Sequence, residues 1–263
     1  MKTLVLVSYA SGSPGAVTSE WVSDKLKAFE KMGFDVILVT STLSSETSSS
    51  SKRVVKVPSL GKADFESEFN PNAGTERNAG GFRSRVLWAI VKGLSLTVGR
   101  LFDAVFVRLA GSLSDGRWSW FFCAAPVAIV LALKNRDSVI VSTGGPSVAH
   151  LVALVASKLS RGRFVCEAQD PLLGSEMRMS ELARRVLLIL ERSLAKNAAK
   201  LVFVTKAAAS AARSRHPMLS SKIFSVYPGA FVFGIRHNPS KVPHDEDQIV
   251  MAHLGHLLSL IHI

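Results

Sequence analysis

The sequence has few cysteines, and it lacks an apolar run long enough to cross a membrane. Only two cysteines occur among the 263 residues, and Cys123 and Cys166 both lie in apolar stretches. We therefore expect buried free thiols in a reducing compartment, not the disulfide framework of a secreted protein. The apolar stretches 82–109 and 118–133 carry charges or fall short of the roughly 20 residues that a spanning helix needs. These absences predict a cytoplasmic chain.

Several functional patterns are also missing. No His, Cys, Asp or Glu residues show metal-ligand spacing, and no nucleophile stands beside a base, so we expect no metal. The basic residues are not interleaved with aromatic ones, so we expect no nucleic-acid partner. The loop at residues 12–15 reads G-S-P-G rather than G-x-G-x-x-G, and residues 39–41 (V-T-S) contain no acidic residue for a ribose. Both observations argue against a nicotinamide-dependent oxidoreductase, which stays an alternative.

Acidic residues are scarce in the middle of the chain. The net charge is +12, and residues 81–241 contain 23 Lys and Arg against eight Asp and Glu. Residues 1–80 are balanced. A basic surface favours anionic partners such as phosphates or anionic lipid headgroups. The alternative is a solvated face that aids solubility.

Short apolar runs alternate with stretches of helical periodicity. Strands are predicted at residues 4–7, 35–40, 53–57, 201–205 and 223–227, and helices at 18–32, 82–109, 118–134, 180–195 and 207–215. Residues 137–171 read as a strand, a helix and a second strand. This alternation predicts an α/β fold, a Rossmann-like, mostly parallel sheet with helices on both faces. The serine-rich residues 41–51 are expected to form a mobile loop.

The composition changes near the end of the chain. We expect a Rossmann-like domain at 1–227, an interdomain linker at 228–248, and the first strand of a second domain within 249–263. The chain ends at Ile263, too early for that second domain to fold. The hypothesis is a truncated reading of a longer gene.

Polar loops follow the predicted strands. Ligands of open α/β sheets bind at the carboxyl ends of strands, where residues 142–146 and 167–170 would lie. The loop after the first strand contains Ser11, Gly12, Ser13 and Gly15. Small residues there let backbone N–H groups approach an anion, and a helix N-terminus favours it. Plain turn and helix-start chemistry are the alternatives for these loops.

Four of these features occur in the order of a known family. They are the small-residue loop after the first strand, S-T-G-G-P-S-V-A-H at 142–150, the strand ending in Asp170-Pro171, and E-R-S-L-A-K-N-A-A-K-L-V-F-V-T at 191–205 leading to Y-P-G-A at 227–230. Together they resemble the N-terminal domain of a GT-B fold, family 4-like glycosyltransferase. The resemblance covers most of residues 1–257.

The resemblance implies a sugar transfer with retention from a nucleotide-sugar donor to a glycan or lipid-linked acceptor. It implies no cofactor, since the nucleotide-sugar is a substrate. The N-terminal domain of such enzymes takes the acceptor, and the donor-binding residues of the other domain would lie beyond Ile263. This chain alone is then expected to be inactive. A non-catalytic binding module remains an alternative.

The resemblance also implies roles for individual residues. Asp170 is the candidate catalytic residue, near the transferred sugar, where the alternative is an Asp-Pro turn. Cleft positions are expected for Ser11, Gly12, Ser13, Gly15, Ser142, Thr143, Gly144, Gly145, Pro146, His150 and Glu167. A packed histidine is the alternative for His150.

Polysaccharide or lipid-linked glycan assembly gives the basic, apolar segment 82–136 a possible role. It would meet an anionic membrane surface, as a peripheral protein on the inner membrane face. The alternative is that these helices only pack on the sheet and on a missing domain.

Overall fold

The computed structural model describes residues 2–12, 17–60, 93, 96–108, 117–135, 137–144, 147–174 and 179–227. All of them belong to a compact unit that comprises Met1–Ala230. The predicted linker and second-domain strand, 228–263, lie outside the described residues. The predicted domain boundaries therefore stay predictions.

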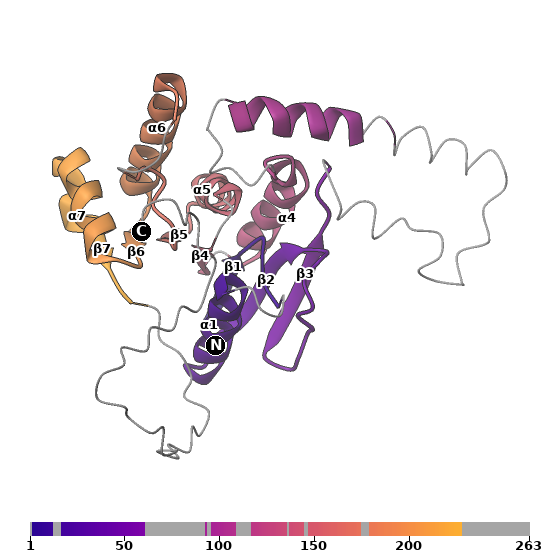
Figure 1. The fold of residues 1–263 in the computed structure, drawn as a ribbon. Coiled ribbons are helices and arrows are strands. Elements are labelled where there is room, and N and C mark those ends of the chain that lie inside the picture. The colour runs from indigo at the N-terminus through magenta and orange to yellow at the C-terminus, as the bar shows by residue number, and fades with distance from the viewer. Residues whose placement is uncertain are drawn as a thin grey trace, which may run out of the picture. The chain divides into compact units, whose positions relative to one another are not determined.

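The described chain forms one sheet in which every paired strand is parallel. Its strands are β1 (Thr3–Val7), β2 (Asp35–Ser41), β3 (Lys52–Val57), β4 (Val139–Thr143), β5 (Arg163–Ala168), β6 (Lys200–Phe203) and β7 (Ile223–Ser225). Their order in the sheet is β3-β2-β1-β4-β5-β6-β7 (Figure 1). The predicted Rossmann-like α/β fold is confirmed by this topology.

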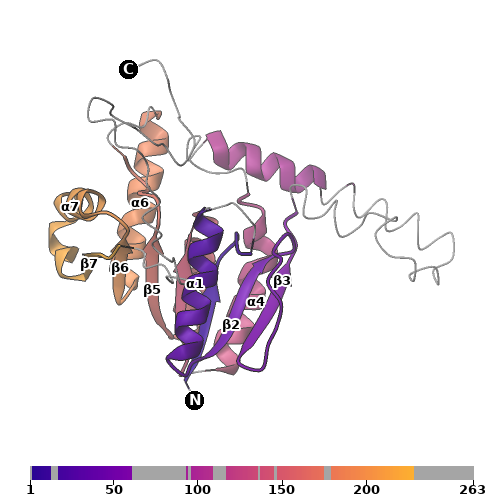
Figure 2. The same ribbon diagram turned by 60° about the horizontal axis from the view of Figure 1, so that its bottom comes forward.

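Helices cover both faces of the sheet and connect its successive strands, except for β2 and β3, which a loop joins. They are α1 (Val17–Lys31), α4 (Trp120–Lys134), α5 (Val148–Ser160), α6 (Glu181–Asn197), α7 (Lys206–Arg215) and the 3-10 helix η1 (Pro217–Lys222), and residues 96–108 are helical as well. Figures 1 and 2 show α1 on one face of the sheet and α4, α5 and α6 on the other. Right-handed crossovers produce this division, because the chain reverses its direction along the sheet after β3.

The two faces carry separate apolar clusters because strand residues alternate between them. Leu4 and Leu6 of β1 pack with Val22 and Leu26 of α1. The other cluster lies under α4 and α5, and its largest fully buried side chain is Trp120. The Trp120 indole N–H donates to the carbonyl oxygen of Val57 at 3.0 Å. This bond fixes the start of α4 against the end of β3.

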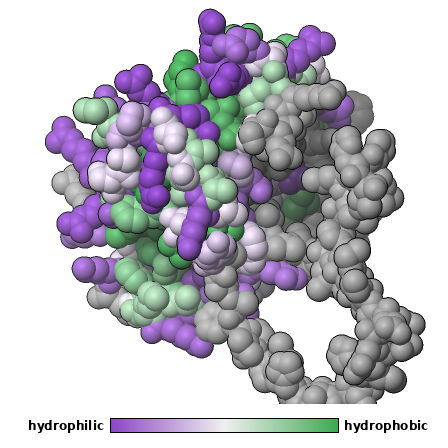
Figure 3. All heavy atoms as spheres, turned by 60° about the vertical axis from the view of Figure 1, so that its left-hand side comes forward, coloured by the Kyte–Doolittle hydropathy of each residue, from purple (hydrophilic) through white to green (hydrophobic). Residues whose placement is uncertain are grey.

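A buried carboxylate joins α6 to the end of α7. Glu191 is fully buried, and Arg215 donates two hydrogen bonds to it at 2.9 and 2.8 Å. His216 lies 2.9 Å from the same carboxylate through Nε2. We call these three residues the Glu191 cluster. The adjacent surface, over α6 and α7, mixes hydrophilic and apolar side chains (Figure 3).

The serine-rich segment after β2 is tied to its surroundings by hydrogen bonds, and its predicted mobility stays a prediction. Ser44 is buried, and its hydroxyl lies 2.8 Å from that of Ser11. Lys56 Nζ donates to the Ser44 carbonyl oxygen at 2.5 Å. Ser51 donates to Glu30 at 2.5 Å. Low sequence complexity gave no sign of these contacts, because each partner comes from a different element.

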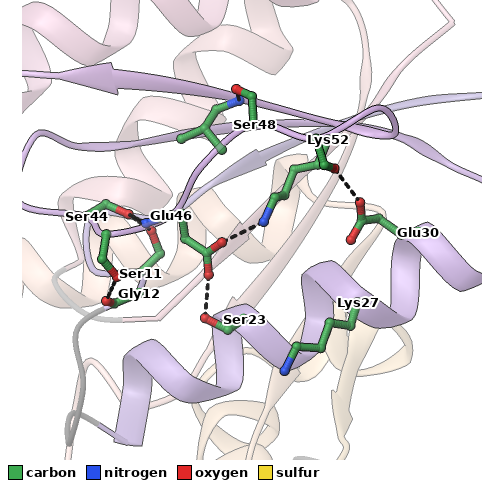
Figure 4. A network of polar contacts seen from close by, with 12 residues as sticks. Ser11, Gly12, Ser23, Lys27, Glu30, Ser44, Glu46, Ser48 and Lys52 are labelled. Atoms are coloured by element: carbon green, nitrogen blue, oxygen red, sulfur yellow. Dashed lines mark hydrogen bonds and ion pairs between the residues drawn. The ribbon is translucent and has the colours of Figure 1, made fainter.

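Glu46 is the charged centre of this segment (Figure 4). Its carboxylate accepts hydrogen bonds from Lys52 and Ser23, each at 2.6 Å. Burial acts to raise the pKa of Glu46, but these hydrogen bonds and the charges of Lys52 and Lys27 outweigh it and lower the pKa. Glu46 therefore links the loop to β3 and α1 as a carboxylate.

The cysteine prediction holds for the absence of a disulfide. Both cysteines are free thiols; Cys166 is buried, and Cys123 is partly buried. Burial raises the pKa of Cys166 to about 12, so this thiol stays protonated at neutral pH. Protonated thiols are poor nucleophiles.

Candidate functional site

The sheet order reverses between β1 and β4, which is where ligands bind in open α/β folds. β1 pairs with β4 on one side and with β2 on the other. The helix after β1 leaves toward one face of the sheet, and the helix after β4 leaves toward the other (Figures 1 and 2). The carboxyl ends of β1, β4 and β5 therefore form the candidate site.

Polar side chains take over from apolar ones at these strand ends. Ser8 follows β1, Thr143 ends β4, and Glu167 and Gln169 lie at the end of β5. Alternate residues of a strand share a face of the sheet, and these four residues follow the strand positions whose side chains face α1. Ser8 and Thr143 are fully buried, and Gln169 is 6% exposed. We call these four residues the carboxyl-end layer.

A chain of hydrogen bonds links three members of this layer to α1. Lys25 Nζ lies 3.0 Å from one oxygen of Glu167. Thr143 donates its hydroxyl to the other Glu167 oxygen at 3.1 Å. Gln169 Nε2 in turn donates to the Thr143 oxygen at 3.3 Å. Among the described residues, Gln169 Oε1 has no hydrogen-bond partner.

Gly144 lies beside this unpartnered oxygen. Its φ of +89° is in the left-handed region that favours glycine. A Cβ at Gly144 would lie 3.4 Å from Ser8 Oγ and 3.8 Å from both polar atoms of the Gln169 amide. The Ser8 hydroxyl donates to the carbonyl oxygen of Ala10 at 3.0 Å. A side chain at position 144 would therefore have room for its Cβ, and the positive φ is what favours glycine there.

Two predicted cleft residues, Ser142 and His150, contact each other on the α5 face of the sheet. His150 Nδ1 lies 2.9 Å from Ser142 Oγ, and both side chains are buried. Burial lowers the pKa of His150 to about 4, so the ring is neutral at pH 7. This geometry matches the packed-histidine alternative. Ser142 and Thr143 are adjacent in β4, but their side chains lie on opposite faces of the sheet.

The small-residue loop after β1 contacts the loop after β2. Ser11 is buried between the hydroxyls of Thr40 and Ser44, at 2.8 Å from each. Gly12 has a φ of +65°, and a Cβ there would lie 2.7 Å from Ser45 Oγ and 2.8 Å from the Glu46 backbone nitrogen. These contacts give Ser11 and Gly12 a structural role. Their predicted roles near phosphates and acceptor stay predictions.

Four predicted site residues, Ser13, Gly15, Gly145 and Pro146, lie outside the described residues. Asp170 is described, follows β5 directly and is exposed. Next to it, a hollow of about 1060 Å³ extends from Pro171 and Leu173 to Arg184 on α6 and Thr205 at the start of α7. Asp170 therefore lies at the same end of the sheet as the carboxyl-end layer, and its catalytic role stays a prediction.

Three residues of this site had no assigned role from the sequence, namely Ser8, Lys25 and Gln169. Ser8 and Gln169 each stand at the end of a buried strand, and that position was the available signal. Lys25 gave none, because its contact with Glu167 joins residues that are far apart in the chain. Their common location follows from the parallel pairing of β1, β4 and β5.

Two searches of the described residues bear on metals and membranes. No group of three or more His, Cys, Asp or Glu residues in that part of the chain is arranged to hold a metal ion. None of its helices combines the length and the apolar character needed to traverse a bilayer.

Solved structures similar to this chain include three complexes of Anabaena Alr3699/HepE, with UDP-glucose, with UDP, and with UDP and glucose. Each is 13% identical, with a TM-score of 0.46, over 88% of this chain and 44 to 45% of that one. The chain thus spans less than half of that protein. Neither a scan against protein-family models nor a search of curated proteins gave a match. The fold assignment, a Rossmann-like α/β domain, rests on the topology described above.

Proposed function

We propose that this chain is the acceptor-side domain of a glycosyltransferase that uses a nucleotide-sugar. One observation carries the proposal, namely the carboxyl-end layer at the point where the strand order reverses. Its carboxylate, amide and hydroxyl groups suit a neutral, hydroxyl-rich ligand, since a few placed polar groups fix a ligand's orientation. The motif order that resembles family 4-like enzymes supports the same reading.

Asp170 is proposed as the catalytic residue at this end of the sheet. A carboxylate there stabilises positive charge that develops on the sugar as the leaving group departs. Its exposure, at the end of β5, lets a substrate reach it. In its specific form, the proposal is that the transfer retains the configuration of the sugar and that the acceptor is a polysaccharide or a lipid-linked glycan.

The oxidoreductase alternative finds little support at the end of β2. A dinucleotide-binding fold commonly places a carboxylate there for the ribose. Here β2 ends in Thr40 and Ser41, and the Thr40 hydroxyl contacts the Tyr9 carbonyl oxygen at 3.2 Å and the Ser11 hydroxyl at 2.8 Å. The Thr40 hydroxyl therefore makes its hydrogen bonds within the protein, and β2 offers no carboxylate for a ribose.

The test measures release of the nucleotide from UDP-glucose and other nucleotide-sugars, by this chain and by the full product of its reading frame. Asp170→Asn should lower the rate of transfer by about 100-fold or more, as expected for a group that acts on the reacting centre. Asp137→Asn is the matched control, because Asp137 is also exposed but precedes β4 at the opposite end of the sheet. Equal rates for both variants would refute the role of Asp170. Binding without turnover in the full product would favour the non-catalytic module.

We also propose that the helix at residues 96–108 contacts an anionic membrane. Its Phe102 and Phe106 rings pack against Phe122 and Trp118, respectively. An adjoining side of this helix presents Val98, Leu101 and Val105, at 52, 66 and 44% exposure. The exposed residues Arg100 and Arg108 add positive charge to this helix. An apolar stripe with basic residues is typical of a helix that lies in a lipid interface.

Co-sedimentation with phosphatidylserine vesicles at low salt tests this contact. Leu101→Glu should reduce binding several-fold, since it places a negative charge in the apolar stripe. Leu159→Glu is the control, because Leu159 is 60% exposed on α5, outside this helix. Vesicle binding that is equal for both variants, or absent in the wild type, would exclude the proposed surface.

A further inference from the structure

We propose that the hollow between α6 and α7 binds an acidic group of the acceptor, a carboxylate or a phosphate, through the side chain of Arg184. This inference rests on the proposed function and specifies its acceptor as anionic. The carboxyl-end layer would then hold the hydroxyl-rich part of the same molecule. Two observations carry the inference, namely the walls of the hollow and a positive charge that no described residue balances.

The hollow is large enough for a small molecule. Its volume is about 1060 Å³, at the upper end of the range of small-molecule sites. Figures 1 and 2 show α6 next to α7, and the loop after β5 forms a third wall. This loop wall begins at Pro171, directly after Asp170. A ligand in the hollow therefore lies next to the candidate catalytic carboxylate.

Apolar side chains form most of the walls. They are Pro171, Leu173, Met179, Leu188, Ala207, Ala208 and Ala211. Alkyl groups neither donate nor accept hydrogen bonds, so these side chains can bind only the apolar surface of a ligand. Polar side-chain contacts with a ligand must come from the few other residues that line the hollow.

Four ionisable side chains line the hollow, and three of them are arginines. Arg185 contacts Glu181 through Nε at 3.1 Å. Arg215 donates two hydrogen bonds to Glu191. For the guanidinium of Arg184, the described part of the chain provides neither an ion pair nor a hydrogen bond. The hollow therefore carries one positive charge that no described residue balances.

The position of Arg184 on α6 places its side chain toward α7. Arg184, Leu188 and Glu191 recur at helical spacing, so they lie on the same face of the helix. Glu191 faces the end of α7, because Arg215 binds it. Arg184 lies on that face about 10 Å nearer the start of α6. Its guanidinium can therefore reach a ligand in the hollow, although the residue is exposed to solvent.

An oxyanion is the ligand group that this site favours. The guanidinium group stays protonated and offers parallel N–H donors that match a carboxylate or a phosphate. Lys206, the first residue of α7, follows Thr205 of the lining and adds a positive charge. Asp170 adjoins the loop wall, so a negative ligand group is repelled less at the α6 wall, where Arg184 lies. A neutral acceptor would leave the charge of Arg184 to the solvent.

The experiment titrates this chain with four probes, by ligand-observed NMR. Methyl α-glucuronide and methyl α-glucoside differ only in the acidic group, and hexyl phosphate and hexanol form a second such pair. At least one anionic probe should bind about 10-fold or more tightly than its neutral counterpart, which is the scale of one charged hydrogen bond. Tighter binding of the glucuronide would assign the acidic group to a sugar, and tighter binding of hexyl phosphate would assign it to a lipid.

Variants locate the binding of the anionic probe. Arg184→Gln should weaken it about 10-fold or more and leave the neutral probe unchanged, whereas Arg184→Lys, which keeps the charge, should weaken it less. Arg192→Gln is the matched control, because Arg192 is also an exposed arginine of α6 but lies outside the lining of this hollow. Ala211→Leu should weaken binding by filling the hollow. Ser210→Leu is its control, at an exposed position of α7 outside the lining.

Three results would overturn the subsite. One is equal binding, or no binding, of the charged and neutral members of both probe pairs. Another is an equal loss of anion binding in Arg184→Gln and Arg192→Gln, which would indicate a general effect of net charge. The third is anion binding that neither Arg184→Gln nor Ala211→Leu changes.

Kinetics of the full product of the reading frame separate this inference from the proposed function. Transfer that depends on Asp170 but has the same acceptor KM in Arg184→Gln refutes the subsite alone. Anion binding that depends on Arg184, in a full product without transfer, refutes the glycosyltransferase and leaves the subsite. A higher KM for an acidic acceptor at unchanged kcat in Arg184→Gln supports both.

Discussion

The Glu191 cluster and the carboxyl-end layer both place polar groups in the interior, and they differ in how completely those groups are satisfied. Glu191 receives two hydrogen bonds from Arg215 and contacts His216, so both of its oxygens have partners. Gln169 has one donor bond and an unused acceptor. A buried polar group with every partner present is typical of a structural contact, whereas a buried acceptor without a partner calls for an explanation.

The difference follows from where the two groups lie. The Glu191 cluster joins α6 to the end of α7, in the helical layer. The carboxyl-end layer lies where the strand order reverses, which is a position that α/β proteins use for ligands. The comparison predicts large effects on stability at the first group and small ones at the second.

Glu191→Ala should cause the largest loss, about 3 to 5 kcal/mol of unfolding free energy, because it leaves Arg215 and His216 without their buried partner. Urea denaturation measures it. Glu181→Ala is the control, since Glu181 pairs with Arg185 at 3.1 Å on the surface and should cost about 0.5 kcal/mol or less. A loss below about 1 kcal/mol at Glu191 would remove the contrast between the two regions.

His150 extends the comparison to a buried group that titrates. Burial lowers its folded-state pKa to about 4 from 6.5, so the unfolded chain binds the proton more readily between these values. The contribution of neutral His150 to the free energy of unfolding is complete above about pH 6.5. It falls by about 3 kcal/mol as the pH drops toward 4. The difference in urea midpoint between wild type and His150→Gln, followed from pH 7 to 4, isolates this effect. Parallel pH profiles would contradict it.

Gly12→Ala should destabilise by about 2 kcal/mol, and Gly33→Ala by about 1 kcal/mol. Both have positive φ, but only a Cβ at Gly12 meets the Glu46 backbone nitrogen, at 2.8 Å. Thermal unfolding of the two variants separates backbone strain from crowding. Equal losses of stability in the two variants would show that the loop after β2 shifts to accommodate the added Cβ at little cost in free energy.

Gln169→Leu should have the smallest effect on stability, within about 1 kcal/mol of the wild type. It removes one hydrogen bond to Thr143, and it also removes a buried acceptor that had no partner. Urea denaturation of the unliganded chain measures this. A loss of several kcal/mol would mean that Gln169 serves the fold rather than a ligand.

Much of the secondary structure was predictable, because it is written in local patterns. The buried runs that became β1, β2 and β6, and the helical periodicity of α4 and α6, agree with sequence-based expectation. The contacts of the loop after β2 could not be predicted from local patterns. Ser44 and Glu46 look like members of a low-complexity segment until Ser11, Ser23 and Lys52 are brought beside them.

The edge of the sheet that holds the candidate site was predictable from the sequence, but the set of side chains that meet there was not. Asp170 and Glu167 were singled out because they end a strand, and both lie at the expected edge of the sheet. Ser142 and His150 pair with each other on the α5 face, and their expected place in the cleft stays a prediction. Neighbouring strand residues point to opposite faces, so Thr143 joins the carboxyl-end layer while Ser142 does not.

The sequence by itself determined the alternation of strands and helices, the parallel sheet that this alternation requires, and the strand ends where a ligand would bind. Only the tertiary structure decided which side chains meet there. The parallel register that sets Thr143 opposite Glu167 aligns the hydrogen bonds from Lys25 to Gln169 and leaves one oxygen unused beside Gly144. Local periodicity is a property of a few successive residues, whereas this free acceptor depends on the pairing of strands and helices far apart in the chain.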